Sequence, residues 1–384
     1  VLTGADWVAD GLGTLSCQVQ RHRPDGSLMP RPSYTPLAQG AAKHVGDPIA
    51  AILATTRAAA RDAVEALDVE WDPLPAITSG TAALRPGAPA VWPGLCDDNL
   101  CFRFAQGDER ATAAAFARAE HVVSLDFRIS RVSANPMEPR ALIAEWDAAD
   151  ERWTLRTGTQ APHGLRDNLA PVLRASPAQL RVISGDLGGG FGLRSHPTNE
   201  QAVALWAARK LNRPVRWTGD RGEVMSGEPH ARDNDSTVEL ALDAEGRFLA
   251  LRIRTVAALG AYLALNTPHS STNNLGGLAG VYRTPHIFAK VLGAFTNAPP
   301  VAPYRGAGRP EATYAIERAI DVAAARLGMD RAELRRRNLI GPDQFPYRTG
   351  LVFTYDSGDF PEGMRKVLDA ADHAGFAARR AAAE

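Results

Sequence analysis

The chain has 384 residues, of which 45% are hydrophobic and 22% are charged, which is the composition of a folded protein with more than one core. Its 43 basic residues balance 43 acidic ones, so the chain as a whole does not attract nucleic acid or an anionic membrane. Cys17, Cys96 and Cys101 lack the spacing of a redox pair or a metal cluster, so we expect a reduced, cytoplasmic protein. No apolar run reaches the roughly 18 residues of a membrane span, so we expect no transmembrane segment.

The first predicted unit is a small α/β unit. Residues 48–54 are apolar and strand-like, residues 56–66 form a helix that begins at a capping threonine, and residues 67–71 form a second strand. Residues 73–101 are rich in Pro, Gly and Ala and predict a linker between domains. Because the sequence starts at Val1, inside a strand-and-turn pattern, we expect that it is a fragment that lacks its natural N-terminus.

The second predicted unit contains more strands. Apolar and polar side chains alternate over residues 123–130, which predicts a half-buried strand. Residues 141–146 and 152–157 flank a turn-prone segment and predict a hairpin. The other predicted elements are, in chain order, a helix at 111–119, a strand at 180–184, a helix at 198–211, a strand at 214–218, a strand-rich section at 236–255, and a helix from Pro310 to Gly328.

Two glycine-punctuated loops, Gly188–Gly192 and Pro303–Arg309, each precede a helix-like stretch. Glycine lets the backbone approach a ligand closely, and the first turn of a helix offers free N–H donors. Arg305 and Arg309 add guanidinium groups that suit phosphate or an oxo-anion, and Phe191 suits a wall over a ligand. The loops therefore predict a cradle for an anionic group, with a ligand-free turn as the alternative.

A dinucleotide fold is the main alternative for the first loop. Its glycine fingerprint fails at Leu193 and Ser195, whereas Asp220 follows the next strand where a ribose-binding acid could lie. A dinucleotide-binding dehydrogenase therefore stays open as an interpretation. Gln160 offers a side-chain donor at a strand end. The histidines have no metal-ligand spacing, so we expect no direct ligation of a metal by protein side chains.

Taken together, these motifs resemble the molybdenum hydroxylase family, the molybdopterin-binding large subunits of xanthine dehydrogenase, aldehyde oxidase and aerobic carbon monoxide dehydrogenase. The segments that carry the resemblance, in the family's order, are Thr159-Gln160, Gly188–Gly192, Tyr304–Arg309, Asn338–Ile340, Gln344–Tyr347 and Tyr355–Gly358. The resemblance covers essentially the whole chain and is strongest to the bacterial carbon monoxide dehydrogenase-like subunits. It implies a mixed α+β or α/β fold, with a partial α/β hammerhead domain at 1–77, a linker at 78–103 and the first molybdopterin-binding domain at 104–384.

The resemblance also implies a site. Gln160 matches a residue that hydrogen-bonds an oxygen ligand of molybdenum, the first loop covers the metal, and the backbone of Arg305 faces the metal and its pterin. The cofactor-binding residues expected on this basis are Gln160, Gly189, Gly190, Phe191, Gly192, Arg305 and Gly306. The pterin dithiolene rather than a side chain holds the metal, which accounts for the lack of a histidine or cysteine cluster. The general-base glutamate is expected in a second molybdenum domain beyond Glu384, so no catalytic residue is assigned within this chain.

The implied activity is hydroxylation of aldehydes or N-heterocycles with water as the oxygen source. The expected cofactor is molybdopterin cytosine dinucleotide with molybdenum, and electrons would pass to a [2Fe–2S] subunit and an FAD subunit, in a dimer of heterotrimers. Gly306 stands where carbon monoxide dehydrogenases carry a copper-binding cysteine, so we expect neither copper nor oxidation of carbon monoxide. The isolated fragment is expected to be inactive, and a non-catalytic, cofactor-holding half of a split enzyme is the alternative.

Overall fold

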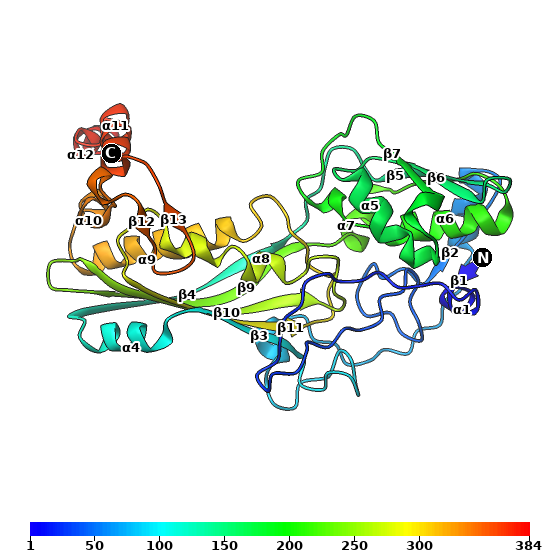
Figure 1. Cartoon of the computed structure of the whole chain (residues 1–384), viewed down its shortest axis with the longest axis horizontal. Helices are drawn as coiled ribbons and strands as arrows, with labels where there is room; N and C mark the ends of the chain where they lie inside the picture. The colour runs from blue at the N-terminus through cyan, green and yellow to red at the C-terminus, as the bar shows by residue number, and fades with distance from the viewer.

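The computed structural model describes residues 1–384 and contains two main sheets (Figure 1). The larger has the strand order β3-β11-β10-β9-β4, and the smaller has the order β7-β6-β5-β8. The strands of the larger sheet are β3 (Leu100–Gly107), β4 (His121–Val132), β9 (Ala231–Leu242), β10 (Phe248–Gly260) and β11 (His286–Phe295). Those of the smaller sheet are β5 (Ala141–Asp147), β6 (Arg152–Thr157), β7 (Leu180–Ile183) and β8 (Val215–Thr218). Two short antiparallel pairs complete the strands: β1 (Leu2–Thr3) with β2 (Ala50–Ala51), and β12 (Tyr347–Arg348) with β13 (Thr354–Tyr355).

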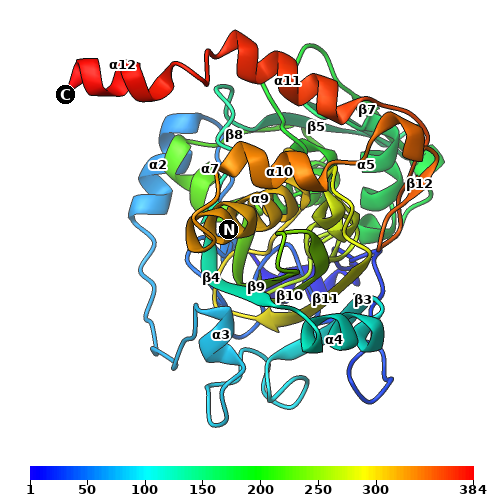
Figure 2. The ribbon, with the colours of Figure 1, turned by 90° about the vertical axis from the view of Figure 1, so that its left-hand side faces the viewer.

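Helices cover both faces of the larger sheet. Helix α9 (Arg309–Arg326) packs against β4 and β9 on one face, and α4 (Glu109–Ala117) packs against β10 and β11 on the other (Figures 1 and 2). Ile316, Ile320 and Ala323 recur at helical spacing along α9 and are all buried. One core of the protein therefore lies between α9 and the larger sheet.

A second core joins the smaller sheet to the N-terminal segment. Helices α5 (Pro162–Leu169) and α6 (Asn199–Leu211) contact the smaller sheet, and the indole Nε1 of Trp153 donates to the Leu205 carbonyl at 2.9 Å. Trp7 packs in the same buried cluster. Residues of the first fifty positions therefore share a core with the smaller sheet, and the division of the chain at 77 and 104 stays a prediction.

The remaining helices are short, and none is both long and apolar enough to cross a bilayer. They are α1 (Gly4–Ala9), α2 (Arg57–Glu65), α3 (Gly80–Ala83), α7 (Arg221–Gly227), α8 (His269–Thr272), α10 (Arg331–Asn338), α11 (Phe360–Ala370) and α12 (Phe376–Ala383). In Figure 1, α11 and α12 lie at the opposite end of the molecule from α1 and β1.

Several predicted elements are confirmed and others are wrong. The hairpin is β5 paired with β6, the alternating strand is β4, and Thr56 caps α2 with its side chain. The strand predicted at 67–71 is wrong, because this segment pairs with no other strand, and only Ala50–Ala51 of the segment 48–54 forms one. Strand β11 was not predicted, although it links β3 to β10 in the larger sheet.

Candidate functional site

The two glycine loops lie against each other. The Arg305 N–H donates to the Phe191 carbonyl at 2.9 Å, and the rings of Phe191 and Tyr304 meet edge to face with centroids 6.5 Å apart. A Cβ atom on Gly192 would lie 2.8 Å from the Pro303 carbonyl oxygen. The prediction that both loops lie at one place is therefore confirmed, although they are more than one hundred residues apart in the sequence.

The Gln160 side chain packs against the first loop. Its Oε1 accepts the Gly192 N–H at 2.8 Å, and its own backbone N–H donates to the Arg194 carbonyl at 3.1 Å. A Cβ on Gly190 would lie 2.5 Å from the same Oε1. Because the side-chain oxygen is used by the loop, the Nε2 group is left as a donor, and it donates to no group of the chain.

Several backbone donors of the two loops have no acceptor in the chain. These are the amides of Gly189, Gly190, Phe191, Tyr304, Gly306 and Gly308. The backbone turns left-handed at Gly189, Gly192, Gly306 and Gly308, and also at the non-glycine residues Phe191 and Ala307. Successive free amides in such a backbone form a concave surface that suits an anion, so the donor set fits the expected cradle.

The structure corrects two details of the predicted cradle. The first loop does not run directly into a helix, because a short 3-10 turn at Leu193–Ser195 separates it from α6, so its donors are loop amides rather than helix amides. The Arg305 amide is bonded to Phe191, so the free donor beside it is the Gly306 amide. The second loop does lead directly into a helix, because Gly308 is the N-cap of α9.

Glu138 and Arg194 hold the ends of the first loop together. The Glu138 carboxylate accepts from the Gly188 N–H and from Arg194 Nη1, the latter at 3.1 Å, and the Arg194 guanidinium also donates to the Glu138 carbonyl. Arg194 is buried, which lowers its guanidinium pKa, and the Glu138 carboxylate acts in the opposite direction. Sequence reasoning missed this pair, since Glu138 is separated from the loop by fifty residues without a motif of its own.

We expect Glu138→Ala to loosen the first loop. The variant leaves the buried Arg194 without its carboxylate, and because the Glu138 side chain is 38% exposed the loss of unfolding free energy should be limited to about 1–2 kcal/mol. Urea unfolding of the chain measures the loss, with Glu145→Ala as control, since Glu145 pairs with Arg156 on the exposed surface. Equal losses in the two variants would count against a holding role for Glu138.

The second loop rests on the segment around α8. The Asn274 side-chain amide donates to the Ala307 carbonyl, and a Cβ on Gly308 would lie 2.0 Å from the Ser270 carbonyl oxygen. Only glycine allows this approach of two backbones at a positive φ. The loop is therefore built into the protein rather than lying free on its surface.

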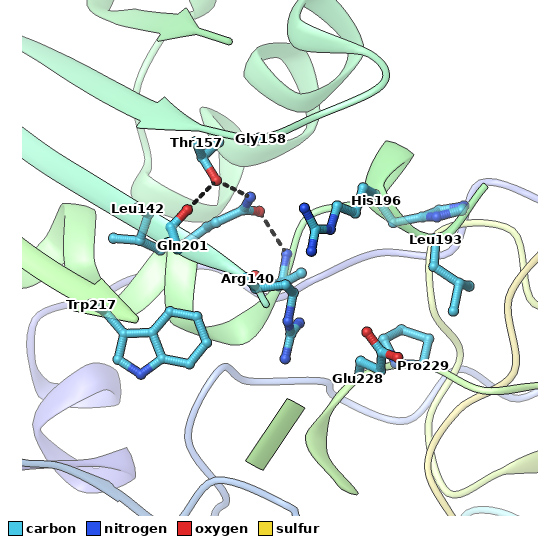
Figure 3. A pocket seen from close by; sticks show the side chains of 13 residues that line it. Arg140, Leu142, Thr157, Gly158, Leu193, His196, Gln201, Trp217, Glu228 and Pro229 are labelled. Atoms are coloured by element: carbon cyan, nitrogen blue, oxygen red, sulfur yellow. Dashed lines mark hydrogen bonds between the residues drawn. The ribbon is translucent and has the colours of Figure 1, made fainter. Parts of the chain in front are cut away.

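A polar cavity is lined in part by Leu193 and Arg194, which directly follow the first loop (Figure 3). Buried Arg140, Arg194, His196 and Glu228 are among the residues that line it. The Nε atoms of the two arginines and Nδ1 of His196 have no partner in the chain, and burial lowers the pKa of His196. The cavity has room for roughly one ordered water molecule, so a large ligand would lie at the exposed junction of the loops instead. No three His, Cys, Asp or Glu side chains gather as a metal-ligand set.

Comparison with known families finds one model that matches most of the chain. The family described as the molybdopterin cofactor-binding domain matches residues 95–339. This segment includes both glycine loops, Gln160, Glu138 and Arg194.

Comparisons with single proteins agree. The chain is 36% identical over 345 residues to the gamma subunit of the 6-hydroxypseudooxynicotine dehydrogenase complex of Paenarthrobacter nicotinovorans, covering 88% of this chain and 43% of the relative. It is 37% identical over 348 residues to the carbon monoxide dehydrogenase large chain of Hydrogenophaga pseudoflava, covering 87% of this chain and 43% of the relative. The crystal structure of quinoline 2-oxidoreductase from Pseudomonas putida 86 matches with a TM-score of 0.90 and 32% identity, over 99% of this chain and 48% of that one. The chain thus spans less than half the length of these relatives.

Proposed function

Because the chain belongs to the molybdopterin cofactor-binding domain family, found in the large subunits of molybdenum hydroxylases, we propose that it is the cofactor-holding part of the catalytic subunit of an oxidoreductase. The proposed reaction is hydroxylation of an aldehyde or an N-heterocycle with water as the oxygen source. The observation that carries the proposal is the junction of the two loops, where six backbone amides and Gln160 Nε2 remain as free donors. The family assignment gives no support to the alternative interpretation of the first loop, which was a dinucleotide-binding dehydrogenase.

The loops fit a large, anionic cofactor. The amides of Gly189, Gly190 and Phe191 would donate to its oxygen atoms, and Gln160 Nε2 would donate to an oxygen near the metal. Phe191, whose surface is 43% exposed, would form an apolar wall and keep water from one side. When bound, the molybdenum group supplies the two-electron redox chemistry of the hydroxylation, and the chain supplies position and hydrogen bonds.

The finer assignments follow from the family resemblance. We propose molybdopterin cytosine dinucleotide as the cofactor, residues 1–77 as part of a hammerhead domain, and [2Fe–2S] and FAD subunits as partners in a dimer of heterotrimers. Two carboxylates are tied to the loops, Glu138 directly and Glu311 through Arg232, and both are paired with arginines. Neither is free to act as a general base, which supports placing the catalytic glutamate outside this chain.

Copper is not part of the proposal. The second loop has Gly306 at the position expected for a copper-binding cysteine, and Cys17, Cys96 and Cys101 are all buried outside both loops. Copper in its thiolate-bound form needs a soft sulfur ligand at the site.

We expect the assembled enzyme to oxidise small aldehydes or N-heterocycles and not carbon monoxide. The test is a panel assay of the purified complex with an artificial electron acceptor, together with metal analysis and identification of the nucleotide released from the cofactor. Molybdenum and cytidine phosphate without copper are expected. Carbon monoxide oxidation with stoichiometric copper, and no turnover of the organic substrates, would overturn the proposal.

A further inference from the structure

Strand β9 has an unusual backbone next to the second loop. Arg232 and Asp233 both have a φ of +68°, in the left-handed region that non-glycine residues rarely adopt. Just before them, His230 pairs with Val301, and the Ala302 N–H donates to the His230 carbonyl at 2.8 Å. The strained residues therefore lie where β9 runs beside the chain that leads into the second loop. Strain of this kind persists when the surrounding contacts enforce it, and it is frequent at functional sites.

The Arg232 side chain uses this position to make three contacts with the loop and the helix that follows it. Its Nη2 donates to the Arg305 carbonyl at 3.0 Å, its Nη1 pairs with Glu311 Oε2 at 2.7 Å, and its guanidinium carbon lies 5.4 Å from the centre of the Tyr304 ring. The side chains of the ion pair are only 13% and 11% exposed. Glu311 lies in the first turn of α9, where a carboxylate is favoured by the helix dipole.

The contact with the Arg305 carbonyl determines the direction of a free donor. In a trans peptide the C=O of one residue and the N–H of the next point in opposite directions. Because Arg232 holds the Arg305 carbonyl, the Gly306 N–H points away from Arg232, and it has no acceptor in the chain. Glycine at 306 has a φ of +85°, so this peptide could otherwise rotate easily.

We propose that Arg232 is a positioning residue of the cofactor site: it locks the Arg305–Gly306 peptide so that the Gly306 amide is presented as a donor. This inference rests on the proposed function for the identity of the ligand. The locking of the loop by itself does not depend on that function. A lysine at 232 could keep the charge opposite Glu311, but it lacks the planar fork that reaches the carbonyl and stacks on Tyr304.

The test compares Arg232→Lys with the wild-type chain by hydrogen exchange. In the 384-residue chain without cofactor, the bonded amides of Arg305, Ala307 and Arg309 should exchange about tenfold faster in the variant, because a hydrogen bond from a charged donor is lost. In the assembled enzyme, the molybdopterin content per subunit should fall by a similar factor.

The control is Arg335→Lys. Arg335 lies on α10 and pairs at 2.7 Å with Glu317 of α9, away from the second loop. It should leave loop exchange and cofactor content unchanged. The role of Arg232 would be refuted if amide exchange and cofactor loading in Arg232→Lys equalled those of the wild type. It would also be refuted if they changed no more than in Arg335→Lys. If Arg232→Lys does not fold, the same criteria are applied to Arg232→Gln. Glutamine keeps an N–H donor, but one of shorter reach. A wild-type enzyme without molybdopterin would refute the proposed function, while the exchange measurement would still decide whether Arg232 locks the loop.

Discussion

Gly192→Val is expected to abolish cofactor loading, and with it the activity of the assembled enzyme. Gly192 has a φ of +102°, and a Cβ there would lie 2.8 Å from the Pro303 carbonyl oxygen, so any side chain both strains the backbone and separates the two loops. Gly190→Val should act in the same way through Gln160, whose Oε1 lies 2.5 Å from the position of the added Cβ. If the substitution weakens the free energy of cofactor binding by about 3 kcal/mol or more, cofactor loading should fall more than about a hundredfold.

The measurement is the molybdenum and nucleotide content of the purified variant, with its thermal unfolding recorded beside it. Gly185→Val is the matched control, because a Cβ at Gly185 would meet nothing within 4 Å and its φ is not positive. We expect the control to load the cofactor normally. Normal loading of Gly192→Val would show that the cofactor does not depend on the contact between the loops, and the site assignment would have to be abandoned.

The 384-residue chain alone is expected to show no turnover of aldehydes or N-heterocycles. Glu138 and Glu311, the carboxylates tied to the loops, are engaged by Arg194 and Arg232, so neither of these two is free to take a proton from water. The chain also spans only 43% of the length of two relatives, so much of a comparable subunit is not represented in it.

This expectation is tested with purified chain supplied with molybdenum-loaded molybdopterin cytosine dinucleotide, an aldehyde or N-heterocycle, and an artificial electron acceptor. The positive control is the assembled enzyme under the same conditions. A chain that binds the cofactor without turnover would support a cofactor-holding role that depends on a base from elsewhere. Turnover by the chain alone would contradict the proposed location of the base, and Glu138→Gln and Glu311→Gln would then be the first variants to assay.

Local patterns in the sequence were sufficient for much of the secondary structure. The alternation that predicted β4, the turn between β5 and β6 and the caps of the helices act over a few residues, so they can be recognised without a partner. Strand β11 escaped prediction because it is buried on both faces, with Ile287 and Ala289 on one face and Phe288 on the other, so it shows no clear alternation. The segment 67–71 has a strand-like composition, but a strand needs a neighbour to bond, and none is present.

The sequence by itself also predicted where the site lies. The glycine-rich loops could be recognised because glycine is required wherever a backbone is approached closely, and that requirement is visible residue by residue. The role of Gln160 came from the family resemblance. The tertiary structure alone decided what holds these loops: Glu138 and Arg194 at the first loop, Arg232 at the second. Their contacts join segments 56 to 73 residues apart, and an arginine or glutamate that is buried by such a fold has no local pattern that distinguishes it from one on the surface.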